Sequence, residues 1–138
     1  MTNEELIEAL NLALAQEHAC AIRYATHAAT ITGPYAEPIA ERLNEISADE
    51  VDHAAKLRER ILALGGEPTL DVSTEDLTPA SKLKDILRIN IDEENHAIEM
   101  YQRILNAVPQ KNAILYQTLQ ELIRDEQEHL EELENLKD

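Results

Sequence analysis

The chain has 138 residues and a formal net charge of −16, which comes from 28 acidic and 12 basic side chains. Such a surface repels phosphate backbones and anionic lipids, so we expect neither nucleic acid nor a membrane as a partner. A hydrophobic content of 43% with three glycines, no Phe and no Trp favours a single all-α domain over residues 1–138. Because Cys20 is the only cysteine and the N-terminus lacks a basic, apolar leader, we expect a cytoplasmic location and no intramolecular disulfide.

Start and stop signals divide the chain into four long helices. Thr2 and Glu5 form a predicted capping box at the start of the first helix, and the pair Gly65-Gly66 ends the second. Thr78 as the cap and Pro79 as the first helical residue predict the start of the third. The four helices are expected at about residues 2–33, 38–65, 79–108 and 110–138.

The lengths of the connections predict the topology. Short turns join the first helix to the second and the third to the fourth, so each pair should be antiparallel. Residues 66–78 show no helical period and are numerous enough to cross the length of a bundle. The expected architecture is therefore an all-α four-helix bundle with one long crossover.

Each predicted helix has an apolar stripe with three- and four-residue spacing, and a carboxylate interrupts every stripe near its middle. The interrupting residues are Glu17, Glu50 with His53, Glu94, and Glu126 with His129. Glu93 takes the place of Glu94 if the third helix is turned by one residue. Burying four carboxylates would cost roughly several kcal/mol of desolvation free energy for each, and the four charges would repel one another. A compensating positive charge is therefore required.

Two divalent metal ions would supply that charge. In a helix, residues three positions apart share a face, so each Glu-x-x-His motif directs a carboxylate and an imidazole to one point. Carboxylate oxygens with one imidazole per metal suit iron or manganese better than a structural zinc site. We therefore expect two Fe ions per chain, with Mn or Zn as alternatives, on the six residues named above.

The two halves of the chain repeat this pattern. Each half has a lone glutamate followed by a Glu-x-x-His motif, and Tyr24 and Tyr101 each follow their lone glutamate by seven residues. Seven residues are two helical turns, so each tyrosine can reach a hydrogen bond to a metal-binding carboxylate. Buried tyrosines that only satisfy their own hydroxyl group are the alternative.

With these motifs the sequence resembles the ferritin-like di-iron carboxylate proteins, most closely bacterioferritin, and it shares features with rubrerythrin. The segments LRERILALGGEPTL (57–70) and IRDEQEHLEEL (123–133) carry much of the likeness. The resemblance implies a ferritin-like four-helix bundle with a centre that oxidises Fe2+ with O2 or H2O2. It further implies that Glu50 and Glu126 bridge the two metals and that Glu17 and Glu94 are terminal ligands.

Two departures from bacterioferritin change the expectation. Val51 stands where that family has a haem-ligating methionine, so we expect no haem. Only nine residues follow His129, without the short fifth helix of bacterioferritin, so we expect a homodimer rather than a storage cage. The rubredoxin-type cysteines of rubrerythrin are absent, so an electron donor would be a separate protein.

Two other functions remain open: a structural bundle that binds a non-redox metal, and an iron-storage cage subunit. Outside the stripes, we expect His18, His27 and His96 on the surface or between subunits. Cys20 should pack as a small apolar residue, and Asp125 should belong to a solvated acidic face.

Overall fold

Four long α-helices form most of the chain in the computed structural model, which describes residues 1–137. They are α1 (Asn3–Thr30), α2 (Ala36–Ala63), α3 (Leu83–Ala107) and α4 (Ala113–Asn135), and a short 3-10 helix, η1 (Thr74–Asp76), lies between α2 and α3. The described residues contain no strand. The prediction of an all-α four-helix bundle with one long crossover is therefore confirmed.

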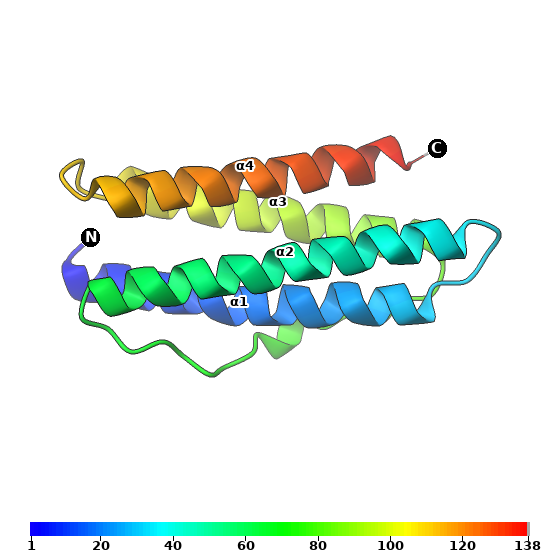
Figure 1. Cartoon of the computed structure of the whole chain (residues 1–138), viewed down its shortest axis with the longest axis horizontal. Helices are drawn as coiled ribbons and strands as arrows, with labels where there is room; N and C mark the ends of the chain where they lie inside the picture. The colour runs from blue at the N-terminus through cyan, green and yellow to red at the C-terminus, as the bar shows by residue number, and fades with distance from the viewer. Residues whose placement is uncertain (138) are drawn as a thin grey trace.

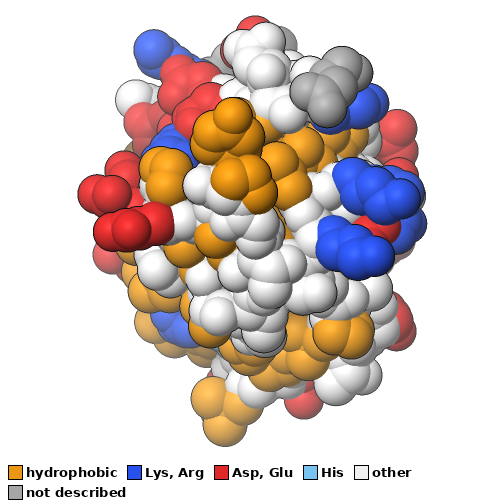
Figure 2. All heavy atoms as spheres, turned by 90° about the vertical axis from the view of Figure 1, so that its right-hand side faces the viewer, with side chains coloured by type: hydrophobic (Ala, Val, Ile, Leu, Met, Phe, Trp, Pro, Cys, Tyr) orange, Lys and Arg blue, Asp and Glu red, His pale blue; other side chains and the backbone are white. Residues whose placement is uncertain are grey.

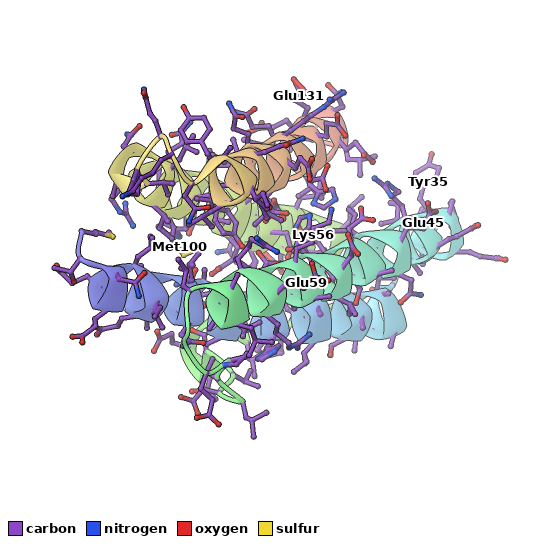
Figure 3. The ribbon with its side chains drawn as sticks, turned by 60° about the vertical axis from the view of Figure 1, so that its left-hand side comes forward. Tyr35, Glu45, Lys56, Glu59, Met100 and Glu131 are labelled. Atoms are coloured by element: carbon purple, nitrogen blue, oxygen red, sulfur yellow. The ribbon has the colours of Figure 1, made fainter. Side chains whose placement is uncertain are left out.

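The bundle consists of two antiparallel hairpins, α1 with α2 and α3 with α4 (Figure 1). The crossover from α2 to α3 runs along the outside of α1 and returns the chain to the opposite end. Side chains fill the space between the two hairpins (Figure 3). None of the described helices has a stretch long and apolar enough to span a membrane.

Local signals account for three of the helix ends. The capping box is present, because the Thr2 hydroxyl accepts a hydrogen bond from the Glu5 amide and the Glu5 carboxylate accepts one from the Thr2 amide. At the start of α4, the Asn112 side chain accepts from the amide of Leu115. Beyond α2, Gly65 has a φ of +87°, a backbone conformation that glycine adopts without the strain other residues incur.

The predicted start of α3 was wrong. The helix begins at Leu83, after Lys82, and not at Pro79 with Thr78 as its cap. Carbonyl groups of residues 78–81 instead accept hydrogen bonds from the end of α1 and the turn after it, which holds this segment outside the helix. The four bonds are His27 Nε2 to Thr78 O at 2.7 Å, Thr30 Oγ1 to Ala80 O at 2.6 Å, and Thr32 N and Oγ1 to Ser81 O at 2.9 Å and 3.3 Å.

His27 also departs from the expectation of a surface or inter-subunit position, because its exposed fraction is 0%. Its Nε2 donates to the carbonyl of Thr78, and its Nδ1 accepts from the side-chain amide of Asn90. The crossover covers this side of α1, which is why a residue off the apolar stripe is buried. Cys20 is buried and His96 is exposed, and both positions agree with the expectation.

Two separate groups of apolar side chains form the core. The larger group contains Leu10, Leu57 and Leu119, and the smaller one contains Tyr24, Leu43 and other residues toward the opposite end. The interrupting carboxylates divide the apolar stripes between these groups. The fold thus places charged groups at the centre of the bundle, with apolar packing on both sides.

The end of the bundle where α2 begins and α4 ends carries hydrophobic side chains on its surface (Figure 2). Tyr35 and Leu136 are among the exposed large apolar residues, with exposed fractions of 67% and 43%.

Candidate metal centre

All four helices contribute to one buried polar cluster. Its members are Glu17 from α1, Glu50 and His53 from α2, Glu94 from α3, and Glu126 and His129 from α4. Each is at most 2% exposed. The six residues selected from the interrupted stripes therefore come together in the folded chain.

The cluster contains a concentration of unsatisfied polar atoms. Eight buried side-chain nitrogen and oxygen atoms lack a hydrogen-bond partner among the described residues, and all eight belong to these six residues. They include both carboxylate oxygens of Glu50, both of Glu126, and the Nδ1 atoms of His53 and His129. Because buried polar groups are normally paired, this arrangement fits residues that hold a cation.

The ligand atoms form two adjacent groups. Four atoms, from Glu17, Glu50, His53 and Glu126, lie within 4.8 Å of one another, and so do three atoms from Glu94, Glu126 and His129. Glu126 belongs to both groups, and Glu50 lies near both imidazoles. The distances to carboxylate oxygens are 3.3–3.5 Å from His53 Nδ1 and 3.3–3.9 Å from His129 Nδ1.

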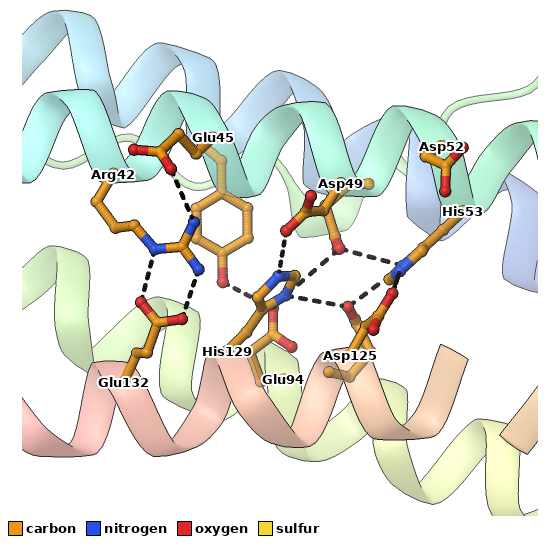
Figure 4. A network of polar contacts seen from close by, with 12 residues as sticks. Arg42, Glu45, Asp49, Asp52, His53, Glu94, Asp125, His129 and Glu132 are labelled. Carbon is orange, nitrogen blue, oxygen red and sulfur yellow. Dashed lines mark hydrogen bonds and ion pairs between the residues drawn. The ribbon is translucent and has the colours of Figure 1, made fainter. Parts of the chain in front are cut away.

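Each imidazole is oriented by an aspartate from the opposite helix (Figure 4). His53 Nε2 lies 2.9 Å from a carboxylate oxygen of Asp125, and His129 Nε2 lies 2.8 Å from one of Asp49. A proton on Nε2 that is donated to the aspartate leaves Nδ1 facing the cluster with its lone pair, which is the form that binds a metal.

These two aspartates were missed as site residues in the sequence, although a signal was present. An aspartate directly precedes the glutamate of both motifs, in DEVDH (49–53) and in DEQEH (125–129). Asp125 was expected on a solvated face, and its side chain is indeed 40% exposed, but the exposed carboxylate also contacts the buried His53.

The two tyrosines bind the lone glutamates in a crossed arrangement. The Tyr24 hydroxyl on α1 donates to Glu94 Oε1 on α3 at 2.7 Å, and the Tyr101 hydroxyl on α3 donates to Glu17 Oε1 on α1 at 2.7 Å. Each tyrosine therefore reaches the glutamate of the other hairpin rather than the one two turns away on its own helix. In both glutamates the other oxygen, Oε2, has no hydrogen-bond partner among the described residues.

Glu94, and not its neighbour Glu93, belongs to the cluster. Glu94 is 1% exposed, whereas the side chain of Glu93 is 20% exposed and lies 3.8 Å from the guanidinium group of Arg23. The register of α3 is therefore the one in which the apolar stripe contains Glu94.

Burial and neighbouring charge shift the pKa values of the cluster. Burial raises the pKa of Glu17 to about 7, and the adjacent Glu50 adds to this effect. Burial likewise raises the pKa values of Glu94 and Glu126. Burial alone would lower the pKa of His53, but hydrogen bonds and charges from Glu17 and Glu50 outweigh it and raise the pKa to about 11. Without a metal, protons therefore supply part of the positive charge that the cluster requires.

A salt bridge joins α2 to α4 one to two turns from His129 (Figure 4). The Arg42 guanidinium donates two hydrogen bonds to the Glu132 carboxylate, at 2.6 Å and 2.5 Å, and lies 3.5 Å from Glu45. This two-point contact links the two helices that carry the Glu-x-x-His motifs.

Three further polar side chains are buried among the described residues: Arg23, His27 and Asn90. Arg23 donates from Nε to Asn90 Oδ1 at 2.9 Å and from a terminal nitrogen to the Asp76 carbonyl at 3.0 Å. The network links α1, α3 and the crossover beside Tyr24, and apolar periodicity alone does not indicate it.

A four-helix bundle with two Glu-x-x-His motifs and two lone glutamates in its core defines a class of carboxylate-rich metal-binding bundles. The sequence model of the family described as the ferritin-like domain matches residues 7–138. The chain belongs to the ferritin-like domain family.

Known relatives agree with this assignment. The chain is 34% identical over 134 residues to bacterioferritin from Desulfovibrio desulfuricans, in an alignment that covers 96% of this chain and 74% of that protein. A solved structure of a ferritin-like, diiron-carboxylate protein from Bacillus anthracis has a TM-score of 0.92 and 32% identity over 99% of this chain and 97% of the other. A dodecameric thioferritin from Bacteroides fragilis has a TM-score of 0.91 and 26% identity over 98% and 85%.

Proposed function

We propose that the chain binds two iron ions in the bundle core and oxidises Fe2+ with O2 or H2O2, as a ferroxidase or peroxidase. The observation that carries this proposal is the set of eight unpaired buried atoms on six residues that converge from four helices. Leaving that many polar atoms unpaired costs folding free energy, and cation binding recovers it.

The residues fit two divalent cations in charge and in chemistry. Four carboxylates carry four negative charges, and each imidazole can offer a neutral nitrogen. Oxygen-rich sites with one imidazole per metal favour iron or manganese, and zinc is also compatible. No described cysteine other than Cys20 is available, which argues against a thiolate site.

The geometry supports different roles for the six residues. Glu50 and Glu126 would be shared by the two metals, because an oxygen of each lies near both imidazoles. Glu17 would complete the position beside His53, and Glu94 the position beside His129. Tyr24 and Tyr101 hold one oxygen of each lone glutamate, and the other oxygen, which has no hydrogen-bond partner, would bind the metal.

Two iron ions side by side can supply two electrons at once to an oxidant. With peroxide the balance is two Fe2+, one H2O2 and two protons giving two Fe3+ and two H2O. The polypeptide contributes fixed ligand positions and a buried environment, and the Asp49 and Asp125 pairs keep both imidazoles in the metal-binding orientation.

The test is an anaerobic titration of metal-free protein with Fe2+, followed by O2 or H2O2 while near-ultraviolet absorbance is recorded. We expect two irons per chain and rapid formation of a ferric absorption band. Glu50→Ala should abolish this behaviour, whereas Glu59→Ala, the same change at an exposed position of α2, is the matched control. Two bound metals that never oxidise would contradict the redox proposal and favour a structural metal.

Storage is a second candidate, because the chain is 34% identical to a bacterioferritin and resembles a dodecameric thioferritin. We nevertheless propose that the chain forms a homodimer rather than a cage. Exposed apolar side chains outside the core offer contact area, among them Ile22 of α1 (46%), Val51 and Leu62 of α2 (57% and 61%) and Leu70 of the crossover (94%).

Mass in solution separates these assemblies. A dimer has twice the 15.6 kDa of one chain, and light scattering distinguishes it from a cage. Val51→Glu should dissociate the dimer if α2 contributes to the contact, whereas Glu59→Gln should leave it intact.

We further propose that the protein is cytoplasmic, that a separate protein is its electron donor, and that it binds no haem.

A further inference from the structure

The second half of the crossover, residues 74–82, is attached to α1 through its backbone carbonyl groups. His27 Nε2 lies 2.7 Å from the carbonyl oxygen of Thr78. Three other residues of α1 and the turn after it bind carbonyl groups of the same segment: Arg23, Thr30 and Thr32. Among these four residues, only His27 can change its charge near neutral pH.

Hydrogen bonds fix His27 in a single neutral form. Arg23 can only donate, so the Asn90 atom that lies 2.9 Å from its Nε is the side-chain oxygen. The NH2 group of Asn90 then faces the carbonyl of Ile86 at 2.8 Å and His27 Nδ1 at 3.0 Å. Nδ1 is therefore an acceptor, and the single ring proton is on Nε2, from which it is donated to Thr78.

A second proton on His27 has no acceptor in this arrangement. It would lie on Nδ1 and face the NH2 group of Asn90, so two donors would meet at 3.0 Å. Asn90 cannot turn over to accept it, because its NH2 group would then face the guanidinium group of Arg23. The new charge would also be cut off from water, since His27 is 0% exposed.

The groups packed around His27 oppose its protonation. Burial lowers the pKa of His27 below 6.5, the bond to Thr78 opposes this shift, and the charge of Arg23 on the same helix adds to it. No charged group of α2 or α4 contributes to the shift. The acidic residues of this region are Glu93 on α3, which lies 3.8 Å from Arg23, and Asp76 in η1, and neither forms an ion pair with His27.

We propose that His27 is a proton-sensitive latch: its neutral form holds residues 74–82 against α1, and its protonation in acid releases this segment while the four helices stay folded. Release lets water solvate the imidazolium and separates it from the NH2 group of Asn90. The inference does not depend on the proposed function, because no hydrogen bond or ion pair joins His27 to the six clustered residues.

The direction of the effect identifies it. A lowered pKa means that the contact of His27 contributes its full stability above pH 6.5 and loses it as pH falls below that value. Protonation of Glu17, whose pKa is raised to about 7, acts in the opposite direction on the metal-free chain as a whole. An opening of the crossover that increases in acid is therefore not a consequence of the buried carboxylates.

The test is amide hydrogen exchange in the purified protein from about pH 7 to about pH 4.5, expressed as protection factors so that the intrinsic pH dependence of exchange cancels. The reporters are the amides of Thr32, which bonds to the carbonyl of Ser81, and of Asp76 and Leu77 in η1. In acid their protection should fall by up to about tenfold per pH unit. The amide of Leu119, in the larger apolar group, should keep its protection.

His27→Gln separates the latch from other effects of acid. The glutamine can place its NH2 group against Thr78 and its oxygen against Asn90, so it keeps both bonds and takes up no proton. The reporter amides should then keep their protection in acid. His96→Gln makes the same change at an exposed position and should open as the wild type does. Loss of cations in acid would affect all three proteins alike. Protection that does not fall in the wild type, or that falls equally in His27→Gln, would overturn the proposal.

A second variant decides the matter if His27→Gln does not hold the segment at any pH. Asn90→Asp places a carboxylate between Arg23 and His27, where it can accept a hydrogen bond from each. We expect the pKa of His27, measured by NMR of its ring protons, to rise above 6.5 and the reporter amides to stay protected in acid. A segment that still opens in acid in this variant, with His27 protonated, would contradict the latch.

Discussion

The hydroxyl group of Tyr101 on α3 donates a hydrogen bond to Glu17 on α1 at 2.7 Å, and so joins the two hairpins at the buried carboxylates. The bond from Tyr24 to Glu94 does the same in the opposite direction. These bonds cross between hairpins, so they couple the position of each lone glutamate to the packing of the partner hairpin.

Tyr101→Phe removes this bond with little change in volume. Because Glu17 Oε1 then has no donor in a buried site, we expect the metal-free protein to lose about 1–3 kcal/mol of unfolding free energy. Urea denaturation measures this loss. Tyr116→Phe removes a hydroxyl from a residue that is 36% exposed and should have little effect. Equal stability of the two variants would contradict a contribution of the bond.

Asp125→Asn weakens the support of His53, because an amide is a poorer acceptor than a carboxylate for the Nε2 proton. We expect a loss of metal affinity of about 10- to 100-fold, with the fold intact. Competition with a coloured chelator measures the affinity. Asp49→Asn should act in the same way on His129, whereas Asp85→Asn, near the start of α3, should bind metal as the wild type does.

The stability of the metal-free protein should fall as pH rises. The pKa of Glu17 is raised from 4.5 to about 7, so between these values the folded protein holds a proton that the unfolded chain has released. Stability from this proton is complete below pH 4.5 and is lost as pH rises through about 7. The pKa of His53, raised from 6.5 to about 11, extends the loss to higher pH.

Melting temperatures from about pH 5 to about pH 9 measure this dependence. In Glu17→Gln the slope between about pH 5 and pH 7 should be smaller, because the variant lacks that titrating group. With saturating Mn2+ the increase in melting temperature should grow with pH, since metal ligands must be deprotonated. A metal-free protein whose stability rises over this range would contradict the raised pKa values.

Glu126→Gln should separate stability from metal binding. Burial and the nearby Glu50 raise the pKa of Glu126, and the substitution keeps this position neutral at every pH, so the metal-free variant should lose less stability than the wild type as pH rises. It also removes a ligand shared by both positions, so the stabilisation by metal should be lost. Calorimetry with and without Mn2+ measures both effects, and Glu128→Gln on the exposed face of α4 is the control.

The bundle and the six clustered residues could be predicted because both follow from local periodicity. Glu50 and His53 interrupt an apolar stripe whose phase is unambiguous, and a helix keeps that phase over its whole length. The start of α3 could not be predicted in this way. Thr78 and Pro79 form a good helix start locally, but contacts from His27, which is 51 positions away, decide their conformation.

The same reason explains the polar residues that were missed. Asp49 is half-exposed and looks like an ordinary surface residue until α4 brings His129 against it. The partner of each tyrosine also depends on how the hairpins face one another, and spacing along one helix does not contain that information. Arg23 is buried only because the crossover and α3 cover it.

Because the carboxylates from both hairpins meet at mid-bundle, the cation content of the protein should govern how readily the hairpins separate. Once Glu17, Glu94 and Glu126 lose the protons that their raised pKa values favour, repulsion among them and Glu50 should push the hairpins apart, and bound cations should oppose it. Slow amide hydrogen exchange in the middle turns of the four helices would then report metal occupancy, while the apolar ends exchange at rates that depend little on it. The middle of the bundle would thus be the part whose local stability depends most on bound cations.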